Sequence, residues 1–146
     1  MAAQGDLLLS IRRQFNWGIV VVGDRDDPDV PVELDEDGFA TSGTTLAFAV
    51  RHAQDTDLDD IDADERVRLA EVAIDVIAGP PTGPTTFQHV VLVRSGSLSI
   101  GDADGVDSVP IESGHCRISV VLNPPERAEN VRVWAEQAAT RGSDGR

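Results

Sequence analysis

The sequence predicts an all-β protein, an antiparallel sandwich or barrel of short strands. Short apolar segments recur along the chain at roughly 8–12-residue spacing, and turns rich in Gly, Pro and Asp separate them. The apolar residues are mostly Val, Ile, Leu and Ala, and the share of Val and Ile favours sheet. At 146 residues, with no internal repeat and no linker, the chain is expected to form a single domain over residues 1–139, with a disordered tail at 140–146.

The first half of the chain contains four candidate strands. Each is a short apolar run, and turn-rich sequences follow the second and the third. The fourth alternates best, with Leu46, Phe48 and Val50 pointing to one face. The four segments are residues 7–11, 18–22, 30–34 and 44–51.

A dense acidic segment follows the fourth strand. Residues 55–65 read DTDLDDIDADE, with seven acidic residues in eleven. Leu58 and Ile61 are its only large apolar side chains. A stretch with so little to bury is expected to be a long, solvated acidic loop.

Residues 67–77 fit both a helix and a strand. Leu69, Val72 and Val76 fall at helical spacing, and the Gly-Pro pair that follows could end a helix. Val72, Ile74 and Val76 also alternate, and the β-branched content is high. Taken alone, this segment slightly favours a helix.

Five further candidate strands occupy the second half. Pro-rich and Gly-rich turns separate them. The last one alternates as a strand would, although Ala128, Val131 and Trp134 also fall at helical spacing. The five segments are residues 87–93, 98–100, 109–111, 116–122 and 130–137.

The formal net charge of −14 limits the partners that the protein can have. It arises from 26 acidic residues against 12 arginines, with no lysine. Phosphate groups are bound by Lys and Arg, so the charge argues against DNA, RNA and anionic membranes as partners. No apolar stretch approaches the ~20 residues of a membrane helix, and the N-terminal apolar run is too short for a signal peptide. With a single cysteine, the chain is expected to be soluble and cytoplasmic.

The sequence contains no recognisable pattern of catalytic or metal-binding residues. Cys116 begins an alternating series with Ile118 and Val120 and is expected to be a small core side chain. His115 precedes it, but neighbouring residues of a strand face opposite sides, and paired-ligand spacings are missing. Nucleophile elbows, phosphate loops and dinucleotide fingerprints are also missing. We therefore predict a non-enzymatic protein that needs no cofactor or metal.

Six stretches together cover most of the chain: FNWGIVVVG (15–23), DGFATSGTTLAFAV (37–50), EVAIDVIAGPP (71–81), FQHVVLVRSGSLSIGD (87–102), VPIESGHCRISVVL (109–122) and AENVRVWAEQ (128–137). They resemble a family of small proteins that includes competence protein J and uncharacterised actinobacterial members. The resemblance implies a β-sandwich, and it replaces the helix at residues 67–77 with a strand. Competence protein J is known as an inhibitor of a DNA-entry nuclease, so an inhibitor-type role is also implied. His115 and Cys116 depart from the pattern, which usually has an aromatic-Arg pair there.

Acidity and resemblance together predict a protein that neutralises a basic partner, such as a nuclease or a toxin, in the manner of an immunity protein. A nuclease active site is basic because it holds phosphates, so a carboxylate-rich face can occupy it. Two alternatives stay open: a scaffold domain whose acidity serves solubility only, and a weak calcium-binding protein, suggested by a partial calcium-loop pattern that begins at residue 60. The candidate contact residues are Asp55, Asp57, Asp59, Asp60, Asp62 and Asp64, with a second cluster of Asp24, Asp26, Asp27 and Asp29.

Overall fold

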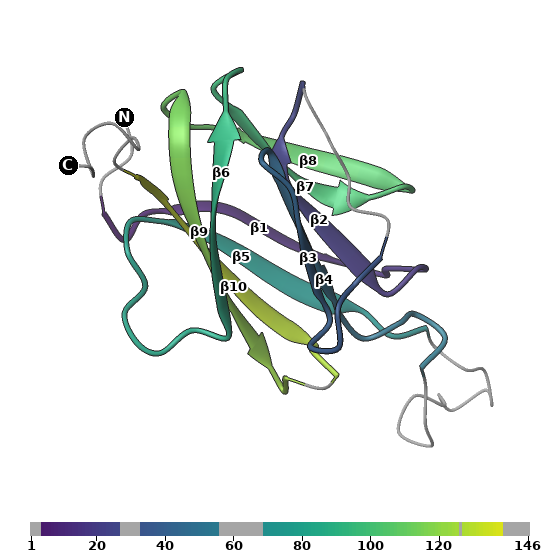
Figure 1. Ribbon diagram of the computed structural model, residues 1–146. Coiled ribbons are helices and arrows are strands. Elements are labelled where there is room, and N and C mark those ends of the chain that lie inside the picture. The colour runs from purple at the N-terminus through teal and green to yellow at the C-terminus, as the bar shows by residue number, and fades with distance from the viewer. Residues whose placement is uncertain (1–3, 27–32, 56–68, 126, 139–146) are drawn as a thin grey trace.

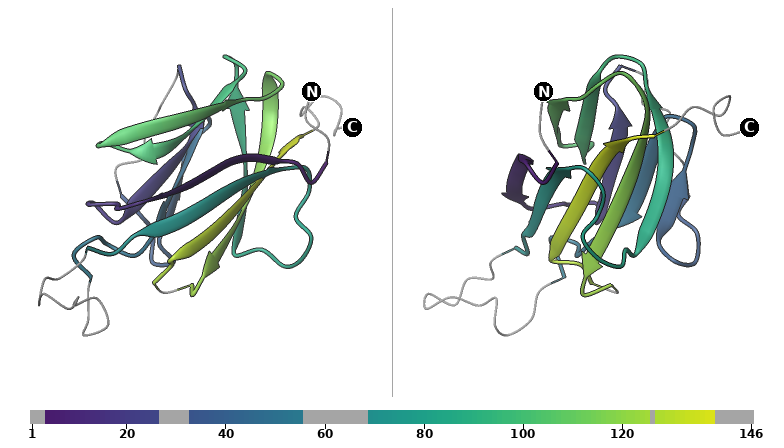
Figure 2. Two further views of the ribbon diagram at one scale, coloured as in Figure 1. Left: turned by 180° about the vertical axis from the view of Figure 1, so that it is seen from behind. Right: turned by 90° about the vertical axis from the view of Figure 1, so that its left-hand side faces the viewer.

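The protein is a β-sandwich. A computed structural model describes residues 4–26, 33–55, 69–125 and 127–138. In these ranges the chain forms ten strands and no helix, and the strands make two five-stranded sheets. Figures 1 and 2 show the two sheets facing each other. The predicted sandwich is confirmed, and the alternative prediction of a barrel was wrong.

The first sheet has mixed strand directions. Its antiparallel pairs are joined by one parallel pair, in which Val131 lies opposite Ile74. This pair joins β5 to the last strand of the chain. Parallel neighbours need a long crossover connection, and here the four strands between them in the sequence provide it. The spatial order is β1 (Leu7–Arg13), β5 (Val72–Ala78), β10 (Asn130–Gln137), β9 (Gly114–Asn123) and β6 (Phe87–Val93).

The second sheet is antiparallel throughout. Sequence patterns missed its short edge strand, which has only three residues and follows a turn directly. The candidate strand at 30–34 falls largely outside the described residues, and residues 33–34 belong to no strand. The spatial order is β3 (Phe39–Thr41), β4 (Thr45–Ala49), β2 (Ile19–Asp24), β7 (Ser97–Asp102) and β8 (Gly105–Pro110).

Several strand predictions hold closely. β6 and β10 have the predicted bounds, so the helical alternative for residues 130–137 was wrong. Within 67–77 a strand begins at Val72, as the resemblance implied, and the slight preference for a helix was wrong. The physical reason is that β5 is paired on both sides, with β1 and β10, which local spacing cannot reveal.

The core lies between the sheets and is built from alternate side chains of each strand. In β5, Val72, Ile74 and Val76 are at most 1% exposed, whereas the residues between them are partly exposed. Cys116 is also buried, as predicted. Its burial raises the pKa of the thiol to about 11, so the thiol stays protonated at neutral pH. The second sheet contributes Val20, Val22, Leu46, Phe48, Leu98 and Ile100.

Candidate functional site

The two ends of the acidic segment are held together on the sandwich. The backbone N–H of Ala70 donates to the carbonyl of Ala53 at 2.9 Å, which closes the base of the segment. The N–H of Ala53 in turn donates to the carbonyl of Phe15 at 3.1 Å, and that of Val50 to Gly18 at 2.9 Å. The segment therefore starts and ends on a fixed base beside the β1–β2 turn, at the lower right of Figure 1.

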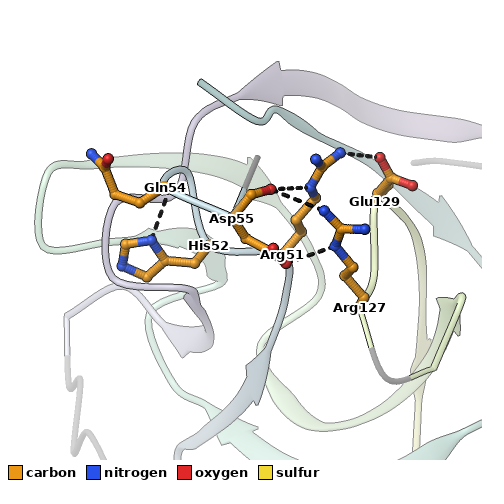
Figure 3. Close-up of polar contacts among 6 residues, drawn as sticks. All are labelled: Arg51, His52, Gln54, Asp55, Arg127 and Glu129. Carbon is orange, nitrogen blue, oxygen red and sulfur yellow. Dashed lines mark hydrogen bonds and ion pairs between the residues drawn. The ribbon is translucent and has the colours of Figure 1, made fainter. Parts of the chain in front are cut away.

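Arg51 is the central side chain of this base. Its side chain is 8% exposed, and its Nε donates to the carbonyl of Asp55 at 2.8 Å. One terminal nitrogen donates to Glu129 at 2.5 Å (Figure 3). The backbone N–H of Arg51 donates to the carbonyl of Ala128 at 2.9 Å. A buried guanidinium needs such partners because its charge has lost water. Arg51 thus ties residues 51–55 to the start of β10.

Arg127 reinforces the same base from outside. Its Nε donates to Oδ2 of Asp55 at 2.6 Å, and a terminal nitrogen donates to the Asp55 carbonyl at 3.1 Å. The two side chains are 36% and 46% exposed, so water screens this ion pair. His52 completes the turn, since its Nδ1 accepts the N–H of Gln54 at 3.0 Å. We call residues 15–18, 51–55, 70 and 127–129 together the clamp end.

The predicted contact residues that the structure describes do not converge on one place. Gly18, which bonds to Val50 at the clamp end, precedes β2, whereas Asp24 is the last residue of β2. At about 3.3 Å per residue, a strand of this length separates Asp24 from the clamp end by about 20 Å. Of the predicted residues, the structure describes Asp24, Asp26 and Asp55. The others lie outside the described residues: Asp57, Asp59, Asp60, Asp62, Asp64, Asp27 and Asp29.

Asp24 is buried and serves as a hydrogen-bond acceptor for the chain itself. It is 1% exposed, and Oδ1 accepts the Ser95 hydroxyl at 2.5 Å and the N–H of Asp26 at 3.2 Å. Oδ2 accepts the N–H of Arg94 at 3.1 Å. Burial raises the pKa of the Asp24 carboxyl, but these hydrogen bonds outweigh it, so the pKa lies below its ordinary value of 3.8. Asp24 therefore joins β2 to the β6–β7 turn, while Asp26 is exposed.

Trp17 is a feature of the clamp end that sequence reasoning missed. Its side chain is 64% exposed, on a turn in which the N–H of Gly18 donates to Phe15 at 3.0 Å. Gly18 has φ +67°, and a Cβ there would lie 3.3 Å from the His52 ring. Trp17 is thus presented on a turn packed against the base of the acidic segment. The signal in the sequence was the Asn-Trp-Gly turn, which the apolar run of the following strand obscured.

The β7–β8 hairpin holds this turn from the other side. The side-chain amide of Asn16 donates to Asp104 at 3.0 Å. Arg13, at the end of β1, donates to Asp102 at 2.8 Å. These contacts fix the Trp17 turn before any partner binds, which reduces the entropy lost on association.

The described residues provide no other obvious chemistry. They include no helix with the length and apolar character that crossing a membrane requires. Their His, Cys, Asp and Glu side chains nowhere gather in threes around a space for one metal ion. The partial calcium-loop pattern falls mostly at residues 60–68, outside the described residues.

Comparison with solved structures identifies two proteins with this fold. One is ComJ from Bacillus subtilis, an inhibitor of the DNA-degrading activity of NucA, which superposes with a TM-score of 0.55 at 14% identity, over 93% of this chain and all of the other. The chain has the fold of ComJ. The second, crocagin biosynthetic gene J, matches with a TM-score of 0.51 at 8% identity, over 95% of this chain and all of the other.

The likeness to ComJ confirms, at the level of fold, the resemblance that the sequence patterns indicated. No family model and no curated protein sequence matches the chain. The shared property is therefore the fold alone, because identities this low carry no residue roles.

Proposed function

We propose that this protein is a non-enzymatic, inhibitor-type binding protein that holds a basic partner protein against its clamp end. The observation that carries the proposal is the closed base of the acidic segment. Ala53 and Ala70 are hydrogen-bonded, and Arg51 ties the first turn to β10. Because the residues on both sides of the acidic segment are anchored at the clamp end, we propose that its carboxylates act there.

The charge of this segment sets the kind of partner. Seven acidic residues lie within 55–65, and Arg66 and Arg68 offset only part of that charge. Such a concentration of carboxylates attracts a basic surface and speeds its approach. A nuclease or a nucleic-acid-directed toxin has a basic active site because it binds phosphates. The inhibition of NucA by ComJ, a protein of the same fold, supports this class of partner.

The contact surface combines charge with one apolar anchor. Trp17 is exposed at the clamp end. It supplies an aromatic contact of the kind that often dominates the binding energy of protein interfaces. The acidic contacts are Asp55, which Arg127 already holds, and the carboxylates that follow it. Asp26 belongs to a separate cluster, and Asp24 supports that cluster indirectly because its own carboxylate is buried. We place this activity in the cytoplasm, without nucleic acid or membrane as a partner.

The test is the salt dependence of association. A partner is captured from extract of the native cells and identified, and its binding to the purified chain is then measured by surface plasmon resonance between about 50 and 500 mM NaCl. The association rate constant should fall at least about tenfold over this range, because salt screens the electrostatic attraction that steers the two proteins together. Changing Asp57, Asp59, Asp60 and Asp62 together to Asn should slow association and flatten the salt dependence.

Matched variants separate a local effect from net charge. Neutralising Asp6, Asp26, Asp107 and Glu112, which are exposed and lie outside the clamp end, changes the net charge equally and should alter the rate much less. Trp17→Ala should mainly speed dissociation. If the association rate constant does not depend on salt, and both charge variants bind like the unmodified chain, then the acidity serves solubility and the proposal is wrong.

A further inference from the structure

A groove lies at the end of the sandwich opposite the clamp end. The clamp end holds the residues before β5 and β10 and after β1, whereas the groove is lined by the first residues of β1 and the last of β5 and β10. Residues 109–112, which end β8 and follow it, form the facing wall. Its volume is about 970 Å³, enough for several amino-acid side chains.

Backbone hydrogen bonds fix the walls of the groove. The N–H of Gly5 donates to Ala78 at 2.7 Å, and the N–H of Ala78 donates to Asp6 at 2.9 Å. The N–H of Gly79 donates to Ala135 at 2.9 Å, which continues the row across β1, β5 and β10. The groove is therefore already formed in the unbound protein, as binding sites usually are.

The floor of the groove is apolar. Val109, Cys116 and Ala135 are 5%, 3% and 7% exposed and lie at its bottom. Leu7 lines the edge and is 59% exposed, one of the few large apolar side chains in the described residues with so much open surface. A second apolar group resting on Leu7 and the floor would remove this surface from water.

The rim of the groove is acidic on both walls. Asp6 and Glu136 come from the side of the first sheet, and Glu112 follows β8 of the second sheet. The described lining includes no Lys, Arg or His. Glu136 also lies 3.7 Å from Arg117, a contact exposed enough to be weak. The electrostatic field of these carboxylates inside the groove therefore favours a cation.

From this apolar floor and acidic rim, we propose that the groove binds a peptide segment of a partner protein in which Arg or Lys is flanked by large apolar side chains. Such a segment buries its apolar groups against the floor and sets its cation between the carboxylates. An uncharged apolar ligand would desolvate the carboxylates without compensation, and an anionic one would be repelled. The groove is separate from the clamp end, and this inference does not rest on the proposed function.

Nuclear magnetic resonance of the full-length ¹⁵N-labelled chain tests the proposal with three blocked hexapeptides. The first has the sequence Leu-Arg-Leu-Leu-Arg-Leu, the second replaces Arg with Glu, and the third replaces Leu with Ser. The first, added up to about 1 mM, should shift the amide resonances of Ala78, Gly79, Glu112 and Gln137 saturably. The other two should bind at least about tenfold more weakly because each lacks one of the two complementary features.

Matched variants locate the binding. Leu7→Ser should weaken the first peptide about tenfold, as expected for losing much of one buried leucine contact. Val106→Ser removes a side chain that is similarly exposed, at 62%, but lies outside the groove. This variant should bind the first peptide with unchanged affinity. Glu112→Gln should weaken binding a few-fold, and Asp107→Asn, an exposed change on β8, should not.

Four results would overturn the proposal: no saturable shift at 1 mM with the first peptide, equal binding of the Glu peptide, equal binding of the Ser peptide, or equal effects of Leu7→Ser and Val106→Ser. A fifth concerns the C-terminal segment of the chain itself. If the full-length double variant Arg141→Ser/Arg146→Ser binds the first peptide tenfold more tightly, that segment competes for the groove, and the occupant is not a partner protein.

Discussion

Asp24 and Asp55 are both acidic residues in acidic surroundings, yet the structure uses them differently. Asp24 is 1% exposed and accepts hydrogen bonds from Ser95 and Arg94, seventy residues further along the chain. Asp55 is half exposed and pairs with Arg127. Both carboxylates help to hold segments together, so local acidity alone does not show which carboxylates are available to a partner.

Asp24→Asn should lower the free energy of unfolding at pH 7 by about 1–2 kcal/mol, because the hydrogen bonds from Ser95 and Arg94 lose a charged acceptor. The depressed pKa of Asp24 means that its contribution is complete above the ordinary value of 3.8 and is lost as the pH falls through the lower folded-state pKa. The difference between the unmodified chain and the variant should therefore shrink below about pH 4. Urea denaturation across this pH range measures it.

The exposed neighbour is the control for this experiment. Asp26→Asn should leave the free energy of unfolding nearly unchanged at every pH, since its side chain faces solvent. A destabilisation by Asp24→Asn that stays constant from pH 7 into the acid range would contradict the assigned role of the charge.

At the level of elements, the clamp end shows how one side chain can connect segments that are far apart in the sequence. Arg51 follows β4 closely and reaches both Asp55 and Glu129, so one guanidinium connects the first turn of the acidic segment to β10. The bond between Ala53 and Ala70 then closes the base just before β5 begins. The loop and the strand that follows it are therefore stabilised together.

Arg51→Met should lower the free energy of unfolding by about 2–3 kcal/mol, because Glu129 and the Asp55 carbonyl lose a buried charged donor. The amide hydrogens of Ala53 and Ala70 should exchange with solvent at least about tenfold faster, since their bonds form the base that Arg51 supports. Urea denaturation and hydrogen-exchange NMR measure the two effects.

Arg127→Met is the matched control for the clamp. Its ion pair with Asp55 is about 40% exposed on average, so the loss should be at most about 1 kcal/mol. Equal losses for the two arginine variants, or unchanged exchange at Ala53 and Ala70 in Arg51→Met, would show that the base does not depend on Arg51.

Over the whole molecule, the two ends of the sandwich have different chemistry. The clamp end combines an acidic segment with the exposed Trp17, and the opposite end has an apolar groove with an acidic rim. We propose a positively charged partner for each end, in keeping with a formal net charge of −14. The same excess of carboxylates repels itself within the folded chain.

Salt should therefore stabilise the free protein. Raising NaCl from about 10 to 200 mM should raise the melting temperature by about 3 °C or more, because screening weakens the repulsion among carboxylates. In the variant with Asp57, Asp59, Asp60 and Asp62 changed to Asn, the four lost charges bring the net charge from −14 to −10, and the gain should be smaller. Circular dichroism melts measure both, and a melting temperature independent of salt in the unmodified chain would count against this account.

Much of the fold could be predicted from the sequence. β6 and β10 were located to the residue, β6 as an apolar run between turns and β10 by its alternation of polar and apolar positions. β3 was missed because three residues are too few for a period, and residues 67–77 stayed ambiguous because a short apolar run fits two periods. The candidate site was predicted only as an acidic segment, without its base or Trp17.

The sequence by itself determined the positions of most strands, the place of Cys116 in the core and the acidity from which we propose a basic partner. Tertiary structure alone decided that Asp24 is buried, that Arg127 meets Asp55 across 72 residues of sequence, and that an apolar groove opens beside Leu7. The reason is physical. Strands and turns follow from the local spacing of side chains, whereas burial and ion pairing depend on which distant segments the packing of two sheets brings together.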